Sequence, residues 1–437
     1  MLSSLKKLRR LLRKIVHISQ RPYYGFVQGH SHITDSQLHK LAKLVDIQSS
    51  KNSDAFENEF ASYLGVEYAT SFASGRMGFY ALLKSLNVKS GNEVILTGST
   101  CAVMANAVLR VGAKPVYADI SLKTYGTCPL AVERLITRDT KVIVAQHSFG
   151  IPCDIDLISK IARARGIFLI EDCALSFGSS LNGTLLGLFG DAALFSFDHT
   201  KPINTMIGGM ICTNSDLDKK LKTIQGQSAE IPVAKRRLLF KKFKFERYFC
   251  NPNNYSQYQV IELLESKFRA IFNLSTAFLT NDSTSTIQSQ SSYPYPAKMP
   301  EFIACLGRME LKRWGLIKNE RQQILKKYID FINNFDCIND IGGTYFNESQ
   351  NVVPLRFVWQ CNNGVDVRNK MKNFLQIERT WFTKPIVDTT EPLENFQYIK
   401  GSCPMSESLE DTIINLPTSI SPLEADVLIA KLSVICK

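Results

Sequence analysis

The sequence predicts an α/β protein, with a large domain built on a mostly parallel central sheet and a smaller C-terminal α+β domain. From about residue 93 to residue 214, short apolar runs alternate with segments whose apolar residues recur every three or four positions. This alternation is typical of buried parallel strands joined by helices. Beyond residue 299, long helical patterns accompany only a few strand-like runs, which favours a second domain. A length of 437 residues agrees, because one hydrophobic core rarely grows that large.

The large domain is expected at residues 51–225. Its strands are predicted where apolar and β-branched residues form short runs, at Glu93–Leu96, Pro115–Ala118, Lys141–Gln146, Ile167–Glu171, Ala192–Phe197 and Met210–Thr213. Its helices are predicted at Phe79–Leu86, Ala102–Val111, Pro129–Ile136 and Asp154–Arg165. In such sheets ligands bind beyond the carboxyl ends of the strands, so the residues that directly follow the strands are candidates for a site.

The smaller domain is expected at residues 299–437. Its helices are predicted at Pro300–Phe331, Val365–Phe374 and Leu423–Ile435, and strand-like runs occupy Val352–Trp359 and Ile377–Phe382.

Two segments carry the positive charge of the chain. The first 34 residues hold seven Lys or Arg and no acid, and residues 235–249 hold seven against one acid. The net charges of these two segments sum to slightly more than the +12 of the whole chain, so the rest of the chain is close to neutral. No nucleic-acid partner is therefore predicted. Residues 1–50 are expected to form a basic N-terminal extension. Residues 226–298 are expected to form a basic insertion that ends in a linker, because Ser275–Ser292 is rich in Ser, Thr and Gln.

The basic segments Leu5–Val16 and Lys235–Phe249 both interleave Lys or Arg with apolar residues. A solvated basic face explains this pattern, and so does peripheral contact with an anionic membrane surface. No run of about 18 apolar residues occurs, and basic residues interrupt the N-terminal segment, so neither a membrane span nor a secretory signal is predicted. The eleven cysteines stand singly, which favours free thiols and no metal site. The expected location is cytoplasmic, with contact at the inner face of the membrane left open.

Three features of the large domain favour a ligand site. Ser74 and Gly75 precede an apolar helical run, and the free N–H groups at such a helix start attract phosphate. Asp172 ends an apolar strand, where an acid needs a cationic partner. Lys201 follows another strand, where apolar walls can make a lysine nucleophilic. Each feature alone also fits a plain cap, a solvated acid or a surface lysine, but their order along one sheet edge favours a common site.

With these residues in this order, the sequence resembles the DegT/DnrJ/EryC1/StrS family of sugar aminotransferases. That family has the aspartate-aminotransferase-like fold (fold type I) and uses pyridoxal 5'-phosphate. The resemblance runs from about Asp54 to Lys437, apart from the basic insertion. It is densest in Gly91–Ile95, Gly112–Val116, Glu171–Ala174, Gly190-Asp191, Phe195–Lys201 and Gly208-Gly209.

The resemblance implies a role for each candidate residue. Lys201 resembles the lysine that carries the cofactor, and Asp172 resembles the acid that faces the pyridine nitrogen; these two are the expected catalytic residues. The remaining positions are expected to bind the cofactor, with the phosphate near Ser74, Gly75, Arg76 and Ser196, and the ring or substrate near Cys101, Leu175 and His199.

The sequence also departs from the family pattern at several positions. Arg76 replaces a threonine, Cys101 an aromatic residue, and Leu175 a glutamine. The family's Gly-Glu-Gly-Gly is here Met206-Ile207-Gly208-Gly209, and its Asn-x-Arg-Met is reduced to Met299.

The resemblance implies transfer of an amino group, from glutamate, to a keto sugar that is expected to be nucleotide-linked. Such a reaction serves the biosynthesis of cell-surface glycans or other amino sugars, and the family implies a homodimer. A sugar dehydratase of the same fold and a catalytically reduced scaffold protein are the alternatives. Dehydrating relatives typically carry histidine in place of the lysine, so Lys201 favours amino transfer.

Overall fold

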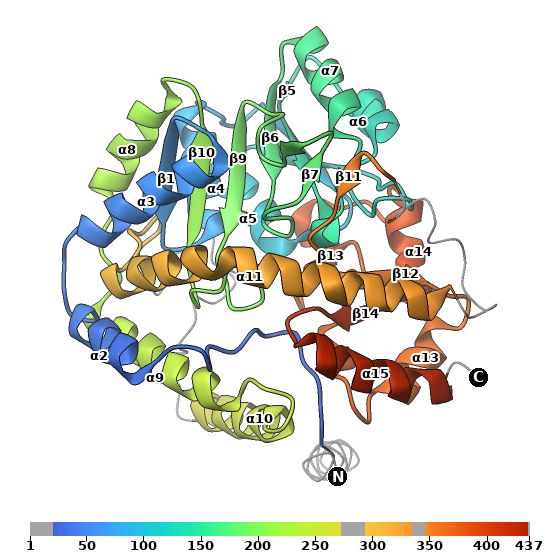
Figure 1. The fold of residues 1–437 in the computed structure, drawn as a ribbon. Helices are drawn as coiled ribbons and strands as arrows, with labels where there is room; N and C mark the ends of the chain where they lie inside the picture. The colour runs from blue at the N-terminus through green and yellow to red at the C-terminus, as the bar shows by residue number, and fades with distance from the viewer. Residues whose placement is uncertain (1–20, 272–292, 334–344, 346, 436–437) are drawn as a thin grey trace.

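A seven-stranded sheet forms the centre of the computed structural model, which describes residues 21–271, 293–333, 345 and 347–435 (Figure 1). The strands follow the order β1-β10-β9-β6-β5-β2-β4, and every strand except β10 runs in the same direction. The mostly parallel sheet is therefore as predicted. Its strands are β1 (Tyr68–Phe72), β2 (Glu93–Thr97), β4 (Lys114–Ala118), β5 (Thr140–Gln146), β6 (Phe168–Asp172), β9 (Ala192–Ser196) and β10 (Gly209–Thr213).

Helices alternate with these strands along the chain. They are α3 (Lys51–Leu64), α4 (Gly75–Ser85), α5 (Ala102–Arg110), α6 (Pro129–Leu135), α7 (Ile155–Arg165) and α8 (Leu217–Gln227). Helices α4 and α5 pack against each other, and α4 also contacts β9 and β10. The start of α4 therefore lies close to the carboxyl end of β9, where a ligand of a parallel sheet is expected.

The C-terminal part begins with the long helix α11 (Glu301–Ile332). Its remaining elements are the antiparallel pair β12 (Arg356–Gln360) and β14 (Ile413–Pro417), the helices α13 (Gly364–Met371), α14 (Pro404–Thr412) and α15 (Pro422–Ile435), and the 3₁₀ turns η4 (Ile377–Arg379) and η5 (Leu393–Phe396). The strand predicted at Ile377–Phe382 is wrong, because these residues form η4 and an irregular segment after it.

Helix α11 takes part in two hydrophobic cores. Its first half, which includes Phe302 and Trp314, packs into the core around the large sheet. Its second half, which includes Ile324 and Tyr328, packs into a core with β12, β14 and α15. The domain boundary predicted at residue 299 stays a prediction.

Short strands join the C-terminal part to the large sheet and to its loops. Strand β13 (Ile386–Val387) pairs with β3 (Thr100–Cys101), just beyond the carboxyl end of β2. A second group is β7 (Ser180–Leu181) with β8 (Thr184–Leu185) and β11 (Gln350–Asn351), and η2 (Ser148–Gly150) follows β5. The β13–β3 pair brings the segment around residue 388 to the edge of the large sheet where the candidate site was predicted.

The basic insertion is helical in its first part. Helices α9 (Val233–Phe249) and α10 (Tyr255–Ile271) lie side by side near α2 (Asp35–Leu44) in Figure 1. The apolar face of α9 is buried in the protein, with Leu239 and Phe243 at zero exposure, which excludes contact of that face with a membrane. The linker predicted at Ser275–Ser292 and the basic segment Leu5–Val16 lie outside the described residues.

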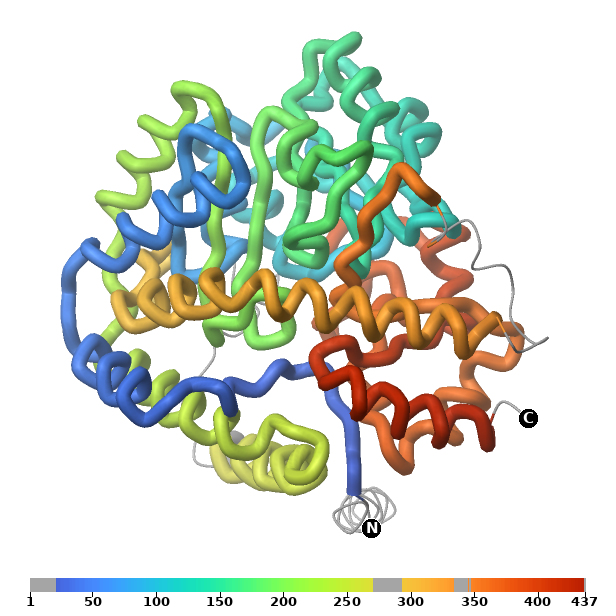
Figure 2. The backbone as a smooth tube through the Cα atoms, in the orientation of Figure 1, coloured from blue at the N-terminus to red at the C-terminus, as the bar shows by residue number. Residues whose placement is uncertain are grey.

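The chain that enters α2 passes between the α9–α10 pair and α15, as Figure 2 shows. The Tyr23 N–H donates to the Pro252 carbonyl at 2.9 Å, and the Tyr24 N–H donates to the Phe374 carbonyl at 2.8 Å. The segment that precedes α2 is thereby hydrogen-bonded both to the insertion and to the C-terminal part. Over the described part of the chain, no helix is both long and apolar enough to cross a bilayer.

Candidate active site

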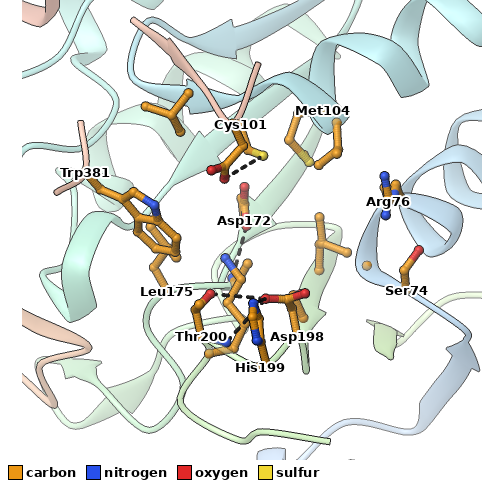
Figure 3. A pocket seen from close by; sticks show the side chains of 18 of the residues that line it. Ser74, Arg76, Cys101, Met104, Asp172, Leu175, Asp198, His199, Thr200 and Trp381 are labelled. Carbon is orange, nitrogen blue, oxygen red and sulfur yellow. Dashed lines mark hydrogen bonds and ion pairs between the residues drawn. The ribbon is translucent and has the colours of Figure 1, made fainter. Parts of the chain in front are cut away.

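A cavity of about 350 Å³ lies at the carboxyl ends of β6 and β9, beside the start of α4. All nine residues predicted from the sequence line this one cavity: Ser74, Gly75, Arg76, Cys101, Asp172, Leu175, Ser196, His199 and Lys201. Figure 3 shows Ser74 and Arg76 on one side, Trp381 on the other and Asp172 between them.

Asp172 is the buried acid of the cavity, only 5% exposed at the end of β6. Its Oδ1 accepts the Ala174 N–H at 3.0 Å. Burial raises the pKa of Asp172, although the Ala174 N–H and the charge of Lys201 act in the opposite direction. A carboxylate in this environment gains from a cationic partner, and a protonated ring nitrogen is such a partner.

Lys201 lies in the loop after β9, and its backbone N–H donates to the Asp198 carbonyl at 2.9 Å. Its Nζ stands 4.7 Å from the centre of the Trp381 ring. The amine therefore reaches the cavity beside an aromatic wall, as a nucleophilic lysine requires.

His199, two residues earlier, lies between two carboxylates. Its Nδ1 is 3.4 Å from Glu246 of α9, and its Nε2 is 3.8 Å from Asp198. Burial alone would lower the pKa of His199, but the charges of Asp198 and Glu246 outweigh it and the pKa is raised. The two flanking carboxylates therefore stabilise the protonated form of this imidazole.

The start of α4 lies in close contact with the end of β9 and the start of β10. The Ser74 side chain caps the helix by accepting the Met77 N–H at 3.4 Å. A Cβ added at Gly209 would lie 2.3 Å from the Gly75 nitrogen, and one added at Gly75 would lie 3.2 Å from the Ser196 Cβ. Glycine at 209 is therefore needed for the start of β10 to pack against the helix N-terminus, and Gly75 leaves little room beside Ser196. The N–H groups and dipole of this helix start favour a phosphate.

Cys101 and Leu175 form part of the cavity wall. Burial, together with the nearby Asp388, raises the pKa of the Cys101 thiol to about 12. The Cys101 Sγ donates to Asp388 Oδ2 at 3.5 Å. A thiol with this pKa is a poor nucleophile at neutral pH, so Cys101 shapes the wall.

The C-terminal part supplies cavity residues that were not predicted from the sequence, including Arg356, Arg379, Trp381 and Asp388. The Arg356 guanidinium packs between the rings of Phe26 and Trp381, at 4.1 and 3.9 Å from their centres. Burial lowers the pKa of Arg356 to about 9. The only available signal was the strand-like run around residue 380, which carried no sign of a site.

Glu171, next to Asp172 on β6, points away from the cavity. Its Oε2 accepts from His147 Nε2 at 3.0 Å and from the Gly187 N–H at 2.9 Å. Its Oε1 accepts the N–H groups of Phe189 and Gly190 at 2.6 and 2.8 Å. His147, Glu171 and Cys173 have ligand atoms within 4.8 Å of one another, but these hydrogen bonds already explain why the first two are buried together.

The sequence and the fold were both compared with known proteins. The profile of the DegT/DnrJ/EryC1/StrS aminotransferase family matches residues 33–243 and 259–431. GDP-perosamine synthase of Escherichia coli O157:H7 is 40% identical over 159 residues, which cover 36% of this chain and 44% of that protein. The UDP-N-acetyl-3-dehydro-alpha-D-glucosamine 3-aminotransferase of Acidithiobacillus ferrooxidans is 34% identical over 202 residues, covering 45% of this chain and 55% of that protein. The chain thus matches about half the length of these curated relatives.

An aminotransferase from Psychrobacter cryohalolentis superposes with a TM-score of 0.68 over 95% of this chain and 98% of that chain, at 18% identity. This likeness confirms the predicted fold class. The family profile extends along most of the chain, from α2 to α15, and its match includes the cavity residues on β6, β9 and the start of α4. The chain therefore belongs to the DegT/DnrJ/EryC1/StrS aminotransferase family.

Proposed function

We propose that the chain is a pyridoxal-phosphate-dependent aminotransferase that moves an amino group from an amino acid, glutamate, to a nucleotide-linked keto sugar. The observation that carries the proposal is the meeting of Asp172, Lys201 and the N-terminus of α4 in one cavity. An acid, an amine and a phosphate site are the three groups that this cofactor needs from a protein.

The residues of the cavity fit the cofactor. Ser74, Gly75, Arg76 and Ser196 would bind the phosphate, and Asp172 would face the ring nitrogen. Arg76 adds a guanidinium that suits bidentate contact with phosphate. Cys101 and Leu175 would flank the ring. When bound, the cofactor supplies an electron-poor pyridine ring that stabilises negative charge on the reacting carbon.

The protein's own groups would do the rest of the chemistry. Lys201 holds the cofactor and, when released, carries a proton between the two carbons as general base and acid. Asp172 keeps the ring nitrogen protonated. Trp381 and Phe382 exclude water on the side of the C-terminal part. A lysine at this position favours amino transfer over the alternative sugar dehydration.

The substrate class draws support from the names of the relatives, which refer to GDP- and UDP-linked sugars. The amino donor and the acceptor bind the same cavity in turn, and the product serves glycan or other amino-sugar biosynthesis. A homodimer is part of the proposal. Peripheral contact with an anionic membrane is also part of the proposal, and α9 offers the exposed residues Lys241 and Lys244 for it. Liposome co-sedimentation with and without residues 1–20 tests the contribution of the basic N-terminal segment.

Borohydride reduction followed by peptide mass spectrometry tests the central proposal. The cofactor mass is expected on the peptide that contains Lys201, and the visible absorption band of the protein is expected to change when glutamate is added. A protein that binds no pyridoxal phosphate, or carries it on another lysine, contradicts the proposal. A screen of GDP-, UDP- and dTDP-linked keto sugars then identifies the acceptor.

A further inference from the structure

The α9–α10 pair adds one carboxylate to the cavity, Glu262, and places a second, Glu246, behind its wall. The family profile is interrupted at residues 244–258, which are the end of α9, the connection and the start of α10. Glu246 lies in this interrupted segment, and Glu262 lies one turn beyond it on α10. Glu262 lines the cavity together with His199 and Lys201.

Glu246 stands directly behind His199. It is fully buried, and its Oε1 lies 3.4 Å from His199 Nδ1 and 3.2 Å from the Tyr258 hydroxyl. A buried carboxylate held in this way fixes the orientation of the imidazole and favours a proton on Nδ1. The other ring nitrogen is then left on the side of Asp198, at the cavity wall.

Glu262 lines the cavity, and its two carboxylate oxygens have different surroundings. Lys242 Nζ at 3.1 Å and the Tyr258 hydroxyl at 2.9 Å both contact Oε1. Among the residues that the structure describes, Oε2 makes no hydrogen bond. Burial opposes ionisation, but Lys242, His199 and the Tyr258 hydroxyl together lower the pKa of Glu262. An ionised, immobilised acceptor in a substrate cavity is suited to bind a donor group of the substrate.

The charges around His199 determine which kind of substrate group can bind at this end of the cavity. Three carboxylates lie around His199, namely Asp198, Glu246 and Glu262, and the cations Lys242 and Arg379 offset part of their charge. Glu262 would repel a carboxylate of an amino-acid donor that approached it. A hydroxyl group both donates and accepts, so it satisfies the carboxylate and the imidazole together.

We propose that the α9–α10 pair recognises the acceptor sugar: Glu262 accepts hydrogen bonds from its hydroxyl groups, and Glu246 positions His199 to donate one. This inference rests on the proposed function, because it names the part of the cavity that the keto sugar occupies. It assigns substrate selection to a helix pair at whose connection the family profile is interrupted.

The test compares Glu262→Gln with Glu265→Gln on the same helix. Glutamine at 262 keeps an oxygen for Lys242 and Tyr258, while Glu265 pairs with Arg269 away from the cavity. The probes are GDP-4-keto-6-deoxymannose and UDP-N-acetyl-3-dehydroglucosamine. Glu262→Gln is expected to raise KM for the probe used by the wild type about tenfold. The reaction with glutamate alone, followed by absorbance, is expected to change far less.

The role of Glu246 is measured without any substrate. In protein with ¹³C-labelled histidine, NMR titration of Glu246→Gln is expected to show the pKa of His199 lowered by about one unit or more. The His199→Asn variant assigns the signal. Tyr258→Phe keeps both carboxylates and serves as a second variant if Glu246→Gln does not fold; it is expected to raise KM about threefold.

Three results would overturn the inference: a KM for the sugar unchanged by Glu262→Gln, a slowing of the glutamate reaction at least as large as the effect on the sugar, or an unchanged pKa of His199 in Glu246→Gln. A wild type that reacts with glutamate but binds neither probe contradicts the recognition of the sugar. A wild type that does not react with glutamate refutes the proposed function instead, while the histidine titration still decides whether Glu246 controls His199.

Discussion

Replacing Asp172 by asparagine removes a buried charge at the place proposed for the ring nitrogen of the cofactor. The side chain is nearly isosteric, and its Oδ1 can still accept the Ala174 N–H. An opposite charge in direct contact shifts a proton affinity by about 1 to 3 pKa units, which corresponds to about 1.4 to 4 kcal/mol. Because Asp172 is only 5% exposed, water does little to screen this interaction. Asp172→Asn is therefore expected to slow the reaction with glutamate by about 10- to 1000-fold.

The assay is a single turnover in which protein loaded with pyridoxal phosphate is mixed with glutamate and the visible band is followed by stopped flow. The bound cofactor is quantified separately after denaturation, so that weaker binding is not mistaken for slower chemistry. An Asp172→Asn protein that holds a full complement of cofactor and reacts at the parental rate would refute the reasoning.

The neighbouring acid provides a matched control. Glu171 accepts four hydrogen bonds on the opposite face of β6, from His147 and three backbone N–H groups. Glu171→Gln replaces one accepting oxygen by a donor and is expected to lower the free energy of unfolding by about 1 to 3 kcal/mol. The rate with glutamate is expected to stay close to the parental value in protein that remains folded.

Three further predictions concern the same cavity. Lys201→Ala is expected to lose both the visible band and measurable turnover, by spectrum and product assay; turnover at the parental rate would contradict its role. Gly209→Ala places a Cβ 2.3 Å from the Gly75 nitrogen, so the start of α4 must shift, and both Tm and cofactor affinity are expected to fall in thermal unfolding and titration. Since the folded protein raises the pKa of His199 above its usual 6.5, the resulting stability is complete below pH 6.5 and disappears as pH rises through the folded-state pKa. Denaturant unfolding at about pH 5.5 and about pH 8.5 should therefore show a larger loss for His199→Asn at the lower pH; an equal loss at both would contradict the raised pKa.

The sequence was sufficient to predict six of the seven strands of the large sheet and the residues at its edge, while β1 was missed. The strands β2, β4, β5, β6, β9 and β10 lie within a residue or two of their predicted positions. Asp172 and Lys201 could be placed on one edge because the sequence puts each at or just beyond the carboxyl end of a buried parallel strand, and the carboxyl ends of such strands meet. This inference needed only local pattern and the order of the strands.

The opposite wall of the cavity depends on long-range packing, which local pattern does not reveal. Residues 377–382 have the apolar spacing of a strand, yet the buried Arg356 contacts the carbonyl of Arg379 and the ring of Trp381, which shape this segment into a turn. A residue in strand β12 therefore determines the conformation of a segment more than twenty positions later.

The packing of the insertion against the protein could not be predicted for a different reason. Its net positive charge indicated a solvated or lipid-facing segment, but a sum of charges does not tell which face each residue occupies. In the structure Arg236 is buried and donates to the Ile47 carbonyl at 2.7 Å, and Lys242 is buried against Glu262. The basic character of α9 is thus partly internal.

Helix α11 is one continuous helix that packs into both hydrophobic cores. At 32 residues it is about 48 Å long, and its hydrogen-bonded backbone continues without a break from one core into the other. A large rotation between the cores would have to bend this rod and sacrifice backbone hydrogen bonds. Opening of the cavity is therefore expected to involve the loops and the insertion at its rim, and not a rotation of one core against the other.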